Sequence, residues 1–181
     1  MTRRGLLFFS AGLILALALG WAGFPRLLYA RAGQPLRFSH KTHVSDATGF
    51  GCADCHSLGE DGRFAGIPGI DNCAACHAEA QGTSADEKRL VEEYVRPGRE
   101  IPWRVYSRQP ENVRFPHAIH VKGALLACER CHGDHGQSDT LPDHETNRIT
   151  GYSRHLTKMS ACEACHAESQ RERTACLACH K

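Results

Sequence analysis

Cysteine and histidine recur in this chain in one fixed arrangement, Cys-x-x-Cys-His, which occurs five times and uses all ten cysteines. Two thiols three residues apart can each form a thioether with the edge of one porphyrin, and the histidine that follows is placed to bind the iron. The spacing therefore predicts five covalently bound haem c groups, with the five histidines as proximal ligands. The copies are Cys52, Cys55 and His56; Cys73, Cys76 and His77; Cys128, Cys131 and His132; Cys162, Cys165 and His166; and Cys176, Cys179 and His180.

Paired cysteines also serve other chemistry. C-x-x-C units can hold zinc, act as thioredoxin-like redox pairs or form structural disulfides. None of these uses needs a histidine directly after the second cysteine, and here all five copies have one. Haem attachment is the interpretation that accounts for every copy.

The histidines outside the five motifs are candidates for the opposite axial position. The pattern Phe-x-His-x-x-His-Val occurs twice, each time shortly before a haem motif. Histidines three residues apart project from one side of a helical turn, so one can reach the nearest haem and the other its neighbour. We predict that His40, His43, His117 and His120 are the distal ligands of four irons.

The fifth iron needs another ligand. His155 and Met159 both lie shortly upstream of Cys162, and chemistry alone makes them nearly equal candidates, because a Met thioether opposite a histidine raises the potential of a haem. His135 and His144 are also unassigned, and both fit solvent-exposed positions.

The amino-terminal segment is apolar. Residues 5–24 carry no charge and are long enough as a helix to cross a bilayer, and Arg3 and Arg4 precede them. Positive charge stays in the cytoplasm, so we expect a single-pass anchor in the cytoplasmic membrane with the haem domain on the periplasmic side. A cleaved signal peptide is the alternative, with Ala30–Ala32 as its cleavage site.

The repeat divides the remainder into two modules. We expect a cytoplasmic tip at 1–4, the transmembrane anchor at 5–24, a dihaem module at 25–82, a connecting helix and extended linker at 83–112, and a trihaem module at 113–181. Within the connection, Ser84 and Glu87 form a capping-box pattern that opens a short helix ending near Val95. Trp103, further along, fits either a spacer packed on haem edges or a partner-docking surface.

Composition favours a core made of cofactors. The 181 residues carry 22 basic and 20 acidic side chains, a net charge of +2 that gives no reason to expect a nucleic-acid binder. Aromatic residues are only 7 %, and much of the apolar content lies in the anchor. The predicted fold is mainly short α-helices and loops wrapped around haems, with one N-terminal transmembrane helix.

These motifs resemble those of the class III multihaem cytochromes. Over nearly the whole chain the sequence is more closely similar to the membrane-anchored multihaem cytochrome c subunit of the menaquinone reductase complex Qrc and to its relative in alternative complex III. The Qrc cytochrome is described with more haems than five motifs can attach, which keeps the pentahaem cytochrome of alternative complex III as a second subfamily. The connecting segments that carry this resemblance are Gly20–Tyr29, Phe64–Pro68, Gly98–Trp103 and Thr150–Ser153.

The resemblance implies an electron-transfer subunit that connects soluble periplasmic cytochrome c with a membrane quinone oxidoreductase complex. Its implied partners are molybdopterin-oxidoreductase-like, iron–sulfur and polytopic quinone-binding membrane subunits. It also implies a methionine ligand on one haem, which favours Met159 over His155. A self-sufficient anchored quinol dehydrogenase is the alternative function. A catalytic nitrite or hydroxylamine reductase is disfavoured, because the C-x-x-C-K motif common in such enzymes is missing from the sequence.

Overall fold

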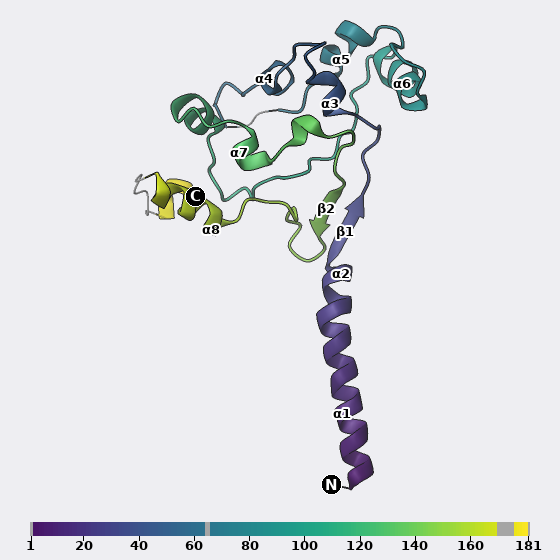
Figure 1. Cartoon of the computed structure of the whole chain (residues 1–181), viewed down its shortest axis with the longest axis vertical. Coiled ribbons are helices and arrows are strands. Elements are labelled where there is room, and N and C mark those ends of the chain that lie inside the picture. The colour runs from purple at the N-terminus through teal and green to yellow at the C-terminus, as the bar shows by residue number, and fades with distance from the viewer. Residues whose placement is uncertain (1, 64–65, 170–175, 181) are drawn as a thin grey trace.

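A long helix carries a domain of short helices and loops at one end (Figure 1). The computed structural model describes residues 2–63, 66–169 and 176–180. Met1 of the predicted tip, residues 64–65 and 170–175 within the two predicted modules, and Lys181 lie outside these ranges. In chain order the elements are α1 Arg3–Ala18, η1 Leu19–Gly23, α2 Phe24–Leu28, β1 Tyr29–Ala32, α3 His40–His43, α4 Cys52–Cys55, α5 Ile70–His77, α6 Ala85–Arg89, η2 Leu90–Val95, η3 Ile119–Gly123, α7 Glu129–His132, η4 His135–Gln137, β2 His144–Asn147, α8 Met159–Glu168 and α9 Cys176–Cys179.

The first three helical elements form one continuous helix from Arg3 to Leu28, which is long and apolar enough to cross a membrane. Thr2 caps it, since its Oγ1 accepts a hydrogen bond from the Gly5 amide at 3.2 Å. None of its apolar window is buried, and the helix extends away from the rest of the chain (Figure 1). The predicted apolar span is therefore present, and the helix continues four residues beyond Phe24 before the first strand begins.

A two-stranded antiparallel sheet joins this helix to the haem-motif domain. Strand β1 pairs with β2 in a register that places Tyr29 opposite Asn147 and Ala32 opposite His144. Arg31 and Asp143 form an ion pair at 2.5 Å beside it. We did not predict this sheet, because each strand has only four residues, neither alternates polar and apolar side chains, and more than a hundred residues separate them.

The apolar core of the domain is small. Its buried cluster consists of Leu36, Ile70, Tyr94 and Ile101, and Trp103 packs partly buried against it. This cluster lies where α5 meets η2, at the end of the domain farthest from α1 (Figure 1). The expectation of a poor side-chain core is confirmed, and within the described structure Trp103 belongs to this core.

The predicted connecting helix is present as α6 continued by η2, and it begins and ends close to the predicted residues. Ser84 caps it through a hydrogen bond from the Glu87 amide to its Oγ at 3.0 Å. The reciprocal half of the predicted capping box is different, because the Glu87 carboxylate accepts hydrogen bonds from the Gln81 amide and from His77. The carboxylate therefore contacts a haem-motif histidine and the loop before the helix, and it does not cap the helix end.

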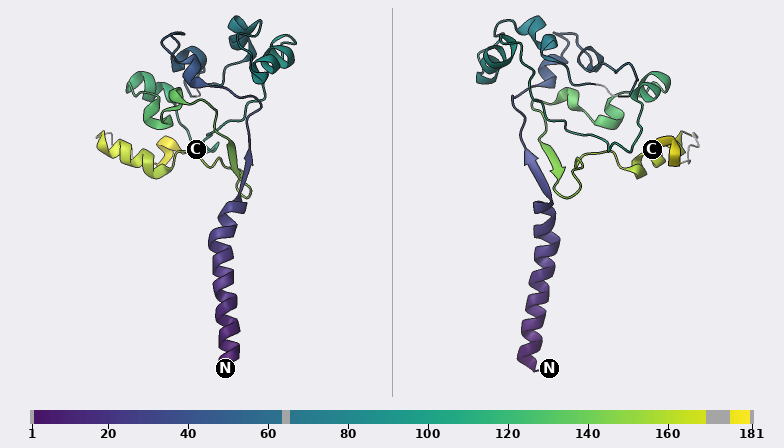
Figure 2. Two further views of the ribbon diagram at one scale, coloured as in Figure 1. Left: turned by 45° about the vertical axis from the view of Figure 1, so that its right-hand side comes forward. Right: turned by 180° about the vertical axis from the view of Figure 1, so that it is seen from behind.

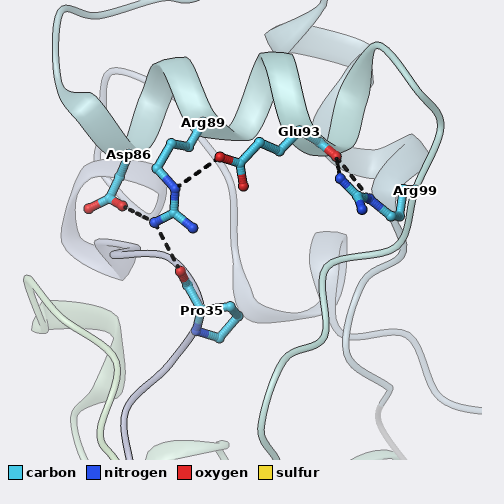
Figure 3. A network of polar contacts seen from close by, with 5 residues as sticks. All are labelled: Pro35, Asp86, Arg89, Glu93 and Arg99. Carbon is cyan, nitrogen blue, oxygen red and sulfur yellow. Dashed lines mark hydrogen bonds and ion pairs between the residues drawn. The ribbon is translucent and has the colours of Figure 1, made fainter.

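A polar network ties this helix to its surroundings (Figure 3). The Arg89 guanidinium contacts Asp86 at 3.3 Å and Glu93 at 3.4 Å on its own helix, and it donates to the Pro35 carbonyl at 3.3 Å. Arg99 donates twice to the Glu93 carbonyl at the helix end, at 3.0 and 2.6 Å. These contacts hold the helix against the segment that leads into α3.

The stretch of chain before the connecting helix contacts the stretch after it, and together they form the two halves of the domain (Figure 2). The Ala118 amide donates to the Gly62 carbonyl at 2.8 Å, and the Lys41 amide donates to the Ser138 carbonyl at 3.1 Å. Gly62 has a φ of +65°, and a Cβ placed there would lie 2.7 Å from the Cβ of Ala118. A glycine is therefore required for this close approach of the two backbones.

Candidate haem-binding sites

The five Cys-x-x-Cys-His motifs all lie on or directly at the end of short helices, namely α4, α5, α7, α8 and α9. A helical turn places the two cysteines of each motif on adjacent positions of one face, with the histidine one residue beyond. None of the ten cysteines, all of which lie in the described residues, is joined in a disulfide. Each motif therefore has the two nucleophilic sulfur atoms that thioether formation requires.

Helix α3 aims one histidine at each of the first two motifs. The ring centres of His40 and His56 lie 6.4 Å apart, and those of His43 and His77 lie 6.1 Å apart. Ser39 begins the helix, with its Oγ accepting from the Thr42 amide at 3.2 Å. A single capped turn thus supplies two histidines three residues apart to two neighbouring sites.

The second histidine pair repeats this arrangement. His117 lies in the helical turn leading into η3, and its ring centre is 6.3 Å from that of His132. His120 lies within η3, 6.2 Å from His166. The structure therefore brings all four sequence-predicted distal histidines opposite a motif histidine and shows which faces which, an assignment that spacing alone did not fix.

These separations fit an iron between each pair. A histidine nitrogen binds a first-row metal at about 2.0 Å, so nitrogens on opposite sides of one iron lie about 4 Å apart and the ring centres about 6 Å apart. The four measured values of 6.1–6.4 Å agree with this expectation. The residues present thus fit four haems that each have two histidine ligands.

Hydrogen bonds orient the rings of these histidines. The Nδ1 atom contacts a backbone carbonyl at 2.8 Å for His43, 2.7 Å for His56, 2.6 Å for His117 and 3.0 Å for His120. A ring that donates from Nδ1 leaves Nε2 unprotonated, which is the atom that binds a metal. His77 differs, because its Nδ1 contacts the Glu87 carboxylate at 2.7 Å.

The electrostatic surroundings favour neutral imidazole. Burial, followed by the nearby rings of His56, His135 and His43, lowers the pKa of His40. Burial also lowers the pKa of His132, with further contributions from neighbouring histidines. Neutral imidazole is the ligand form, so the fold prepares these side chains for coordination near neutral pH.

Thiols of different motifs lie close together, and this closeness orders the motifs in space. Burial and then a thiolate of the adjacent motif raise the cysteine pKa at three junctions. The affected thiols and their neighbours are Cys73 beside Cys55, Cys52 beside Cys128, and Cys162 beside Cys179 and Cys131. The motifs consequently follow one row: 73–77, 52–56, 128–132, 162–166 and 176–180.

An aromatic residue accompanies each pair of distal histidines. Phe38 stacks on His43, with ring centres 4.3 Å apart at 22°, and meets His40 edge-on at 5.1 Å. Phe115 stacks on His120 at 4.4 Å and 26°, and meets His117 edge-on at 4.8 Å. The Phe of the repeated pattern thus holds the ring of the second histidine from one side.

Tyr106 makes the same two contacts with histidines outside the repeat. Its ring stacks on His155 at 4.5 Å and 23° and meets His135 edge-on at 5.4 Å. No local sequence pattern links Tyr106 to these two histidines, because both are distant from it in the chain. Only the folded chain shows that this tyrosine corresponds to Phe38 and Phe115.

The remaining candidates occupy separate places. His144, in β2, contacts the Val105 carbonyl through Nδ1 at 2.7 Å. Met159 begins α8, with 58 % of its surface exposed. His180 forms an isolated antiparallel bridge with Val113, and the Arg114 amide donates to the Cys179 carbonyl at 2.7 Å.

Comparison with known proteins agrees with this geometry. The model of the "Class III cytochrome C family" matches residues 26–99 of this chain. The "Menaquinone reductase, multiheme cytochrome c subunit" of Nitratidesulfovibrio vulgaris (strain Hildenborough) is 45% identical over 187 residues, covering 96% of this chain and 89% of the relative. This chain belongs to the family of that multihaem cytochrome c subunit. The cytochrome is therefore expected to carry covalently bound haem c, as the motifs and the histidine pairs both require.

The family match bears on two predictions from the sequence. The resemblance to class III cytochromes and to the menaquinone reductase subunit is confirmed by the matched residues and by the relative. The fold class is confirmed as well, since short helices and loops surround the histidine pairs and one apolar helix precedes them. The menaquinone reductase subunit is the subfamily that the identity supports.

Proposed function

We propose that this cytochrome is a membrane-anchored pentahaem electron-transfer subunit. It carries electrons between soluble periplasmic cytochrome c and a quinone-reactive membrane complex. When bound, each haem supplies an iron that accepts or gives up one electron. The protein supplies the ligands, the order of the sites and the attachment to the membrane.

The observation that carries this proposal is the pairing of histidines. At four sites two histidines face each other at the spacing that one iron between them would require, so these pairs would fill both of its axial positions. A substrate needs an open coordination position to react at an iron, and paired histidines leave none. This arrangement supports electron transfer and argues against bond-making chemistry at these four irons.

The order of the motifs supports transfer over a distance. Motif 73–77 is at one end of the row, and α5, which carries it, lies at the end of the domain away from α1 (Figure 1). Helix α3 links this site to the next, because His40 and His43 belong to one turn. The turn at His117 and His120 links the third and fourth sites in the same way.

For the fifth haem, at motif 176–180, we propose His155 as the distal ligand in place of Met159. The support is the contact with Tyr106, whose stacking on His155 at 4.5 Å and 23° has the geometry that Phe38 has with His43. Hydrogen bonds also link the 106–109 segment to the His155 region, from Ser107 Oγ to the His155 carbonyl at 2.7 Å. The same segment continues to Val113, which bridges to His180.

Two variants test this ligand. His155→Ala should convert one haem from low-spin to high-spin in the electron paramagnetic resonance spectrum, while Met159→Leu should leave the spectrum and the redox titration unchanged. If Met159→Leu instead lowers one potential or produces a high-spin signal, Met159 is the ligand and the comparison with Phe38 fails.

The membrane topology and partners complete the proposal. Arg3 and Arg4 on the amino-terminal side of the apolar helix support a cytoplasmic start and a periplasmic haem domain. The relative's name assigns that protein to menaquinone reductase. By extension, we propose that this subunit works with molybdopterin-oxidoreductase-like, iron–sulfur and polytopic quinone-binding membrane subunits.

The test is to purify the complex from solubilised native membranes, identify every copurifying subunit, and compare it with the isolated cytochrome. Both should accept electrons from a chemically reduced soluble cytochrome c, but only the complex should exchange them with menaquinone. If the isolated cytochrome is reduced by menaquinol at the rate of the complex, it is a self-sufficient quinol dehydrogenase and the proposal is wrong.

A further inference from the structure

One haem-motif histidine has a charged partner. His77 Nδ1 lies 2.7 Å from Glu87 Oε1, and the two side chains are only 17 % and 16 % exposed. Helix α5 ends at His77, and the chain turns back so that Glu87, in the first turn of α6, faces it. Among the described residues this is the only contact between an imidazole and a carboxylate within hydrogen-bonding distance.

The other paired histidines with an Nδ1 contact to the main chain have neutral partners. His43, His56, His117 and His120 each contact a backbone carbonyl at 2.6–3.0 Å. A carbonyl orients the ring but carries no net charge. The site formed by His43 and His77 therefore differs from its neighbours by the negative charge of a carboxylate in contact with its motif histidine.

Contacts within the protein hold the Glu87 carboxylate in this position. Its Oε1 also accepts a hydrogen bond from the backbone amide of Gln81 at 3.0 Å. The backbone amide of Glu87 donates to Ser84 Oγ at 3.0 Å. Arg89, two residues after Glu87 in α6, donates to the Pro35 carbonyl and so holds the helix against that segment (Figure 3). Because the Gln81 amide holds the carboxylate and the other two contacts hold the helix that carries it, the carboxylate is kept in contact with His77.

A carboxylate that accepts a hydrogen bond from Nδ1 raises the basicity of the imidazole and strengthens its donation to the metal. Stronger donation stabilises ferric iron, the more positive state, relative to ferrous iron. Second-sphere hydrogen bonding of this kind is one of the means by which proteins set haem potentials.

We propose that Glu87, through His77, gives the haem at motif 73–77 the lowest reduction potential of the four haems with paired histidines. Glu87 acts as a positioning and tuning residue, since it touches the ligand and not the iron. The inference rests on the proposed function in one respect, namely that a haem is bound between His43 and His77.

The location of this site gives the low potential a role. Motif 73–77 is at the end of the row of sites and farthest from the anchor helix (Figure 1). A haem held there would take up one electron from a reduced soluble cytochrome, its iron passing from ferric to ferrous, while the proton on His77 Nδ1 would stay in place. Transfer from this site to the neighbouring paired-histidine haem at motif 52–56 would then lead to a higher potential, so the electron would leave this end for the interior of the row.

The test compares Glu87→Gln with Glu92→Gln in the haem-loaded, detergent-solubilised protein. Glutamine keeps an oxygen that can accept from His77 and Gln81 but removes the charge, whereas Glu92 is an exposed carboxylate on the same helix without a histidine partner. Redox titration followed by electron paramagnetic resonance should show one haem in Glu87→Gln with an equilibrium constant for reduction at least tenfold larger, about 59 mV for one electron. Glu92→Gln should match the wild type.

Three results would overturn the inference. The first is a Glu87→Gln titration that superimposes on the wild type, and the second is a shift shared equally by all haems. The third applies to the unmodified protein, should the variant fail to fold: NMR of its successive reduction stages must show the His43/His77 haem as the last of the four to be reduced, and any other order contradicts us. Absence of a haem from motif 73–77, seen as a lower haem count by mass spectrometry, would instead refute the proposed function.

Discussion

Gly62 offers a direct test of how the two halves of the haem domain are held together. Its φ of +65° lies in the left-handed region, and a Cβ there would lie 2.7 Å from the Cβ of Ala118. Gly49 has the same kind of backbone, with a φ of +69°, but no atom lies within 4 Å of the position of its Cβ. The pair Gly62→Ala and Gly49→Ala therefore separates backbone strain from steric overlap.

The expected losses follow from these two contributions. A left-handed residue with a Cβ costs about 1–2 kcal/mol, so Gly49→Ala should lower the free energy of unfolding by that amount. Gly62→Ala adds an overlap of the kind that costs about 1–3 kcal/mol in a packed site, giving about 2–5 kcal/mol in total. Guanidinium chloride unfolding of the haem-loaded protein, followed by far-ultraviolet circular dichroism, measures both losses.

A spectroscopic result should accompany the loss. The Gly62 carbonyl accepts from Ala118, and the carbonyl of the next residue, Arg63, contacts His117 Nδ1 at 2.6 Å. Displacing this loop should weaken the His117 ligand and raise the high-spin fraction of one haem in Gly62→Ala but not in Gly49→Ala. Equal destabilisation of the two variants would refute the close contact between Gly62 and Ala118.

Two further predictions concern the small core and the connecting helix. Ile70→Ala should lower the free energy of unfolding by about 2–5 kcal/mol, because Ile70 is 5 % exposed within the apolar cluster, whereas Ile149→Ala, at a site 74 % exposed, should change it by less than about 0.5 kcal/mol. Denaturant unfolding checks both, and similar losses would contradict the location of the core. Ser84→Ala should cost about 0.5–2 kcal/mol in the same assay, since it removes the acceptor for the Glu87 amide, and an unchanged midpoint would show that this cap is not stabilising.

Much of the fold was accessible from the sequence because covalent motifs and strong local signals dictate it. The Cys-x-x-Cys-His copies appear on short helices, the apolar run appears as a helix from Arg3 to Leu28, and Ser84 begins a helix that continues to Val95. The β1–β2 pairing was missed, since it depends on contacts between Tyr29–Ala32 and a segment more than a hundred residues away. Short strands without alternation give no signal in a single sequence.

In the candidate haem sites, too, local patterns could be predicted from the sequence and long-range contacts could not. Spacing identified His40, His43, His117 and His120, and the structure places each of them opposite a motif histidine. Spacing did not reveal which motif each one faces, because this depends on how the loops return. It also assigned the Glu87 carboxylate to a helix cap, whereas the fold directs the carboxylate to His77.

We propose that each of the five haem irons is bound by two histidines, four of them through the observed pairs and the fifth through His155 and His180. Near-infrared magnetic circular dichroism of the fully oxidised protein, normalised to its haem content, distinguishes histidine–histidine from histidine–methionine ligation and low-spin from high-spin iron. We predict the intensity of five bis-histidine haems. A histidine–methionine band would contradict the assignment of His155, and high-spin intensity from two or more irons would contradict the account as a whole.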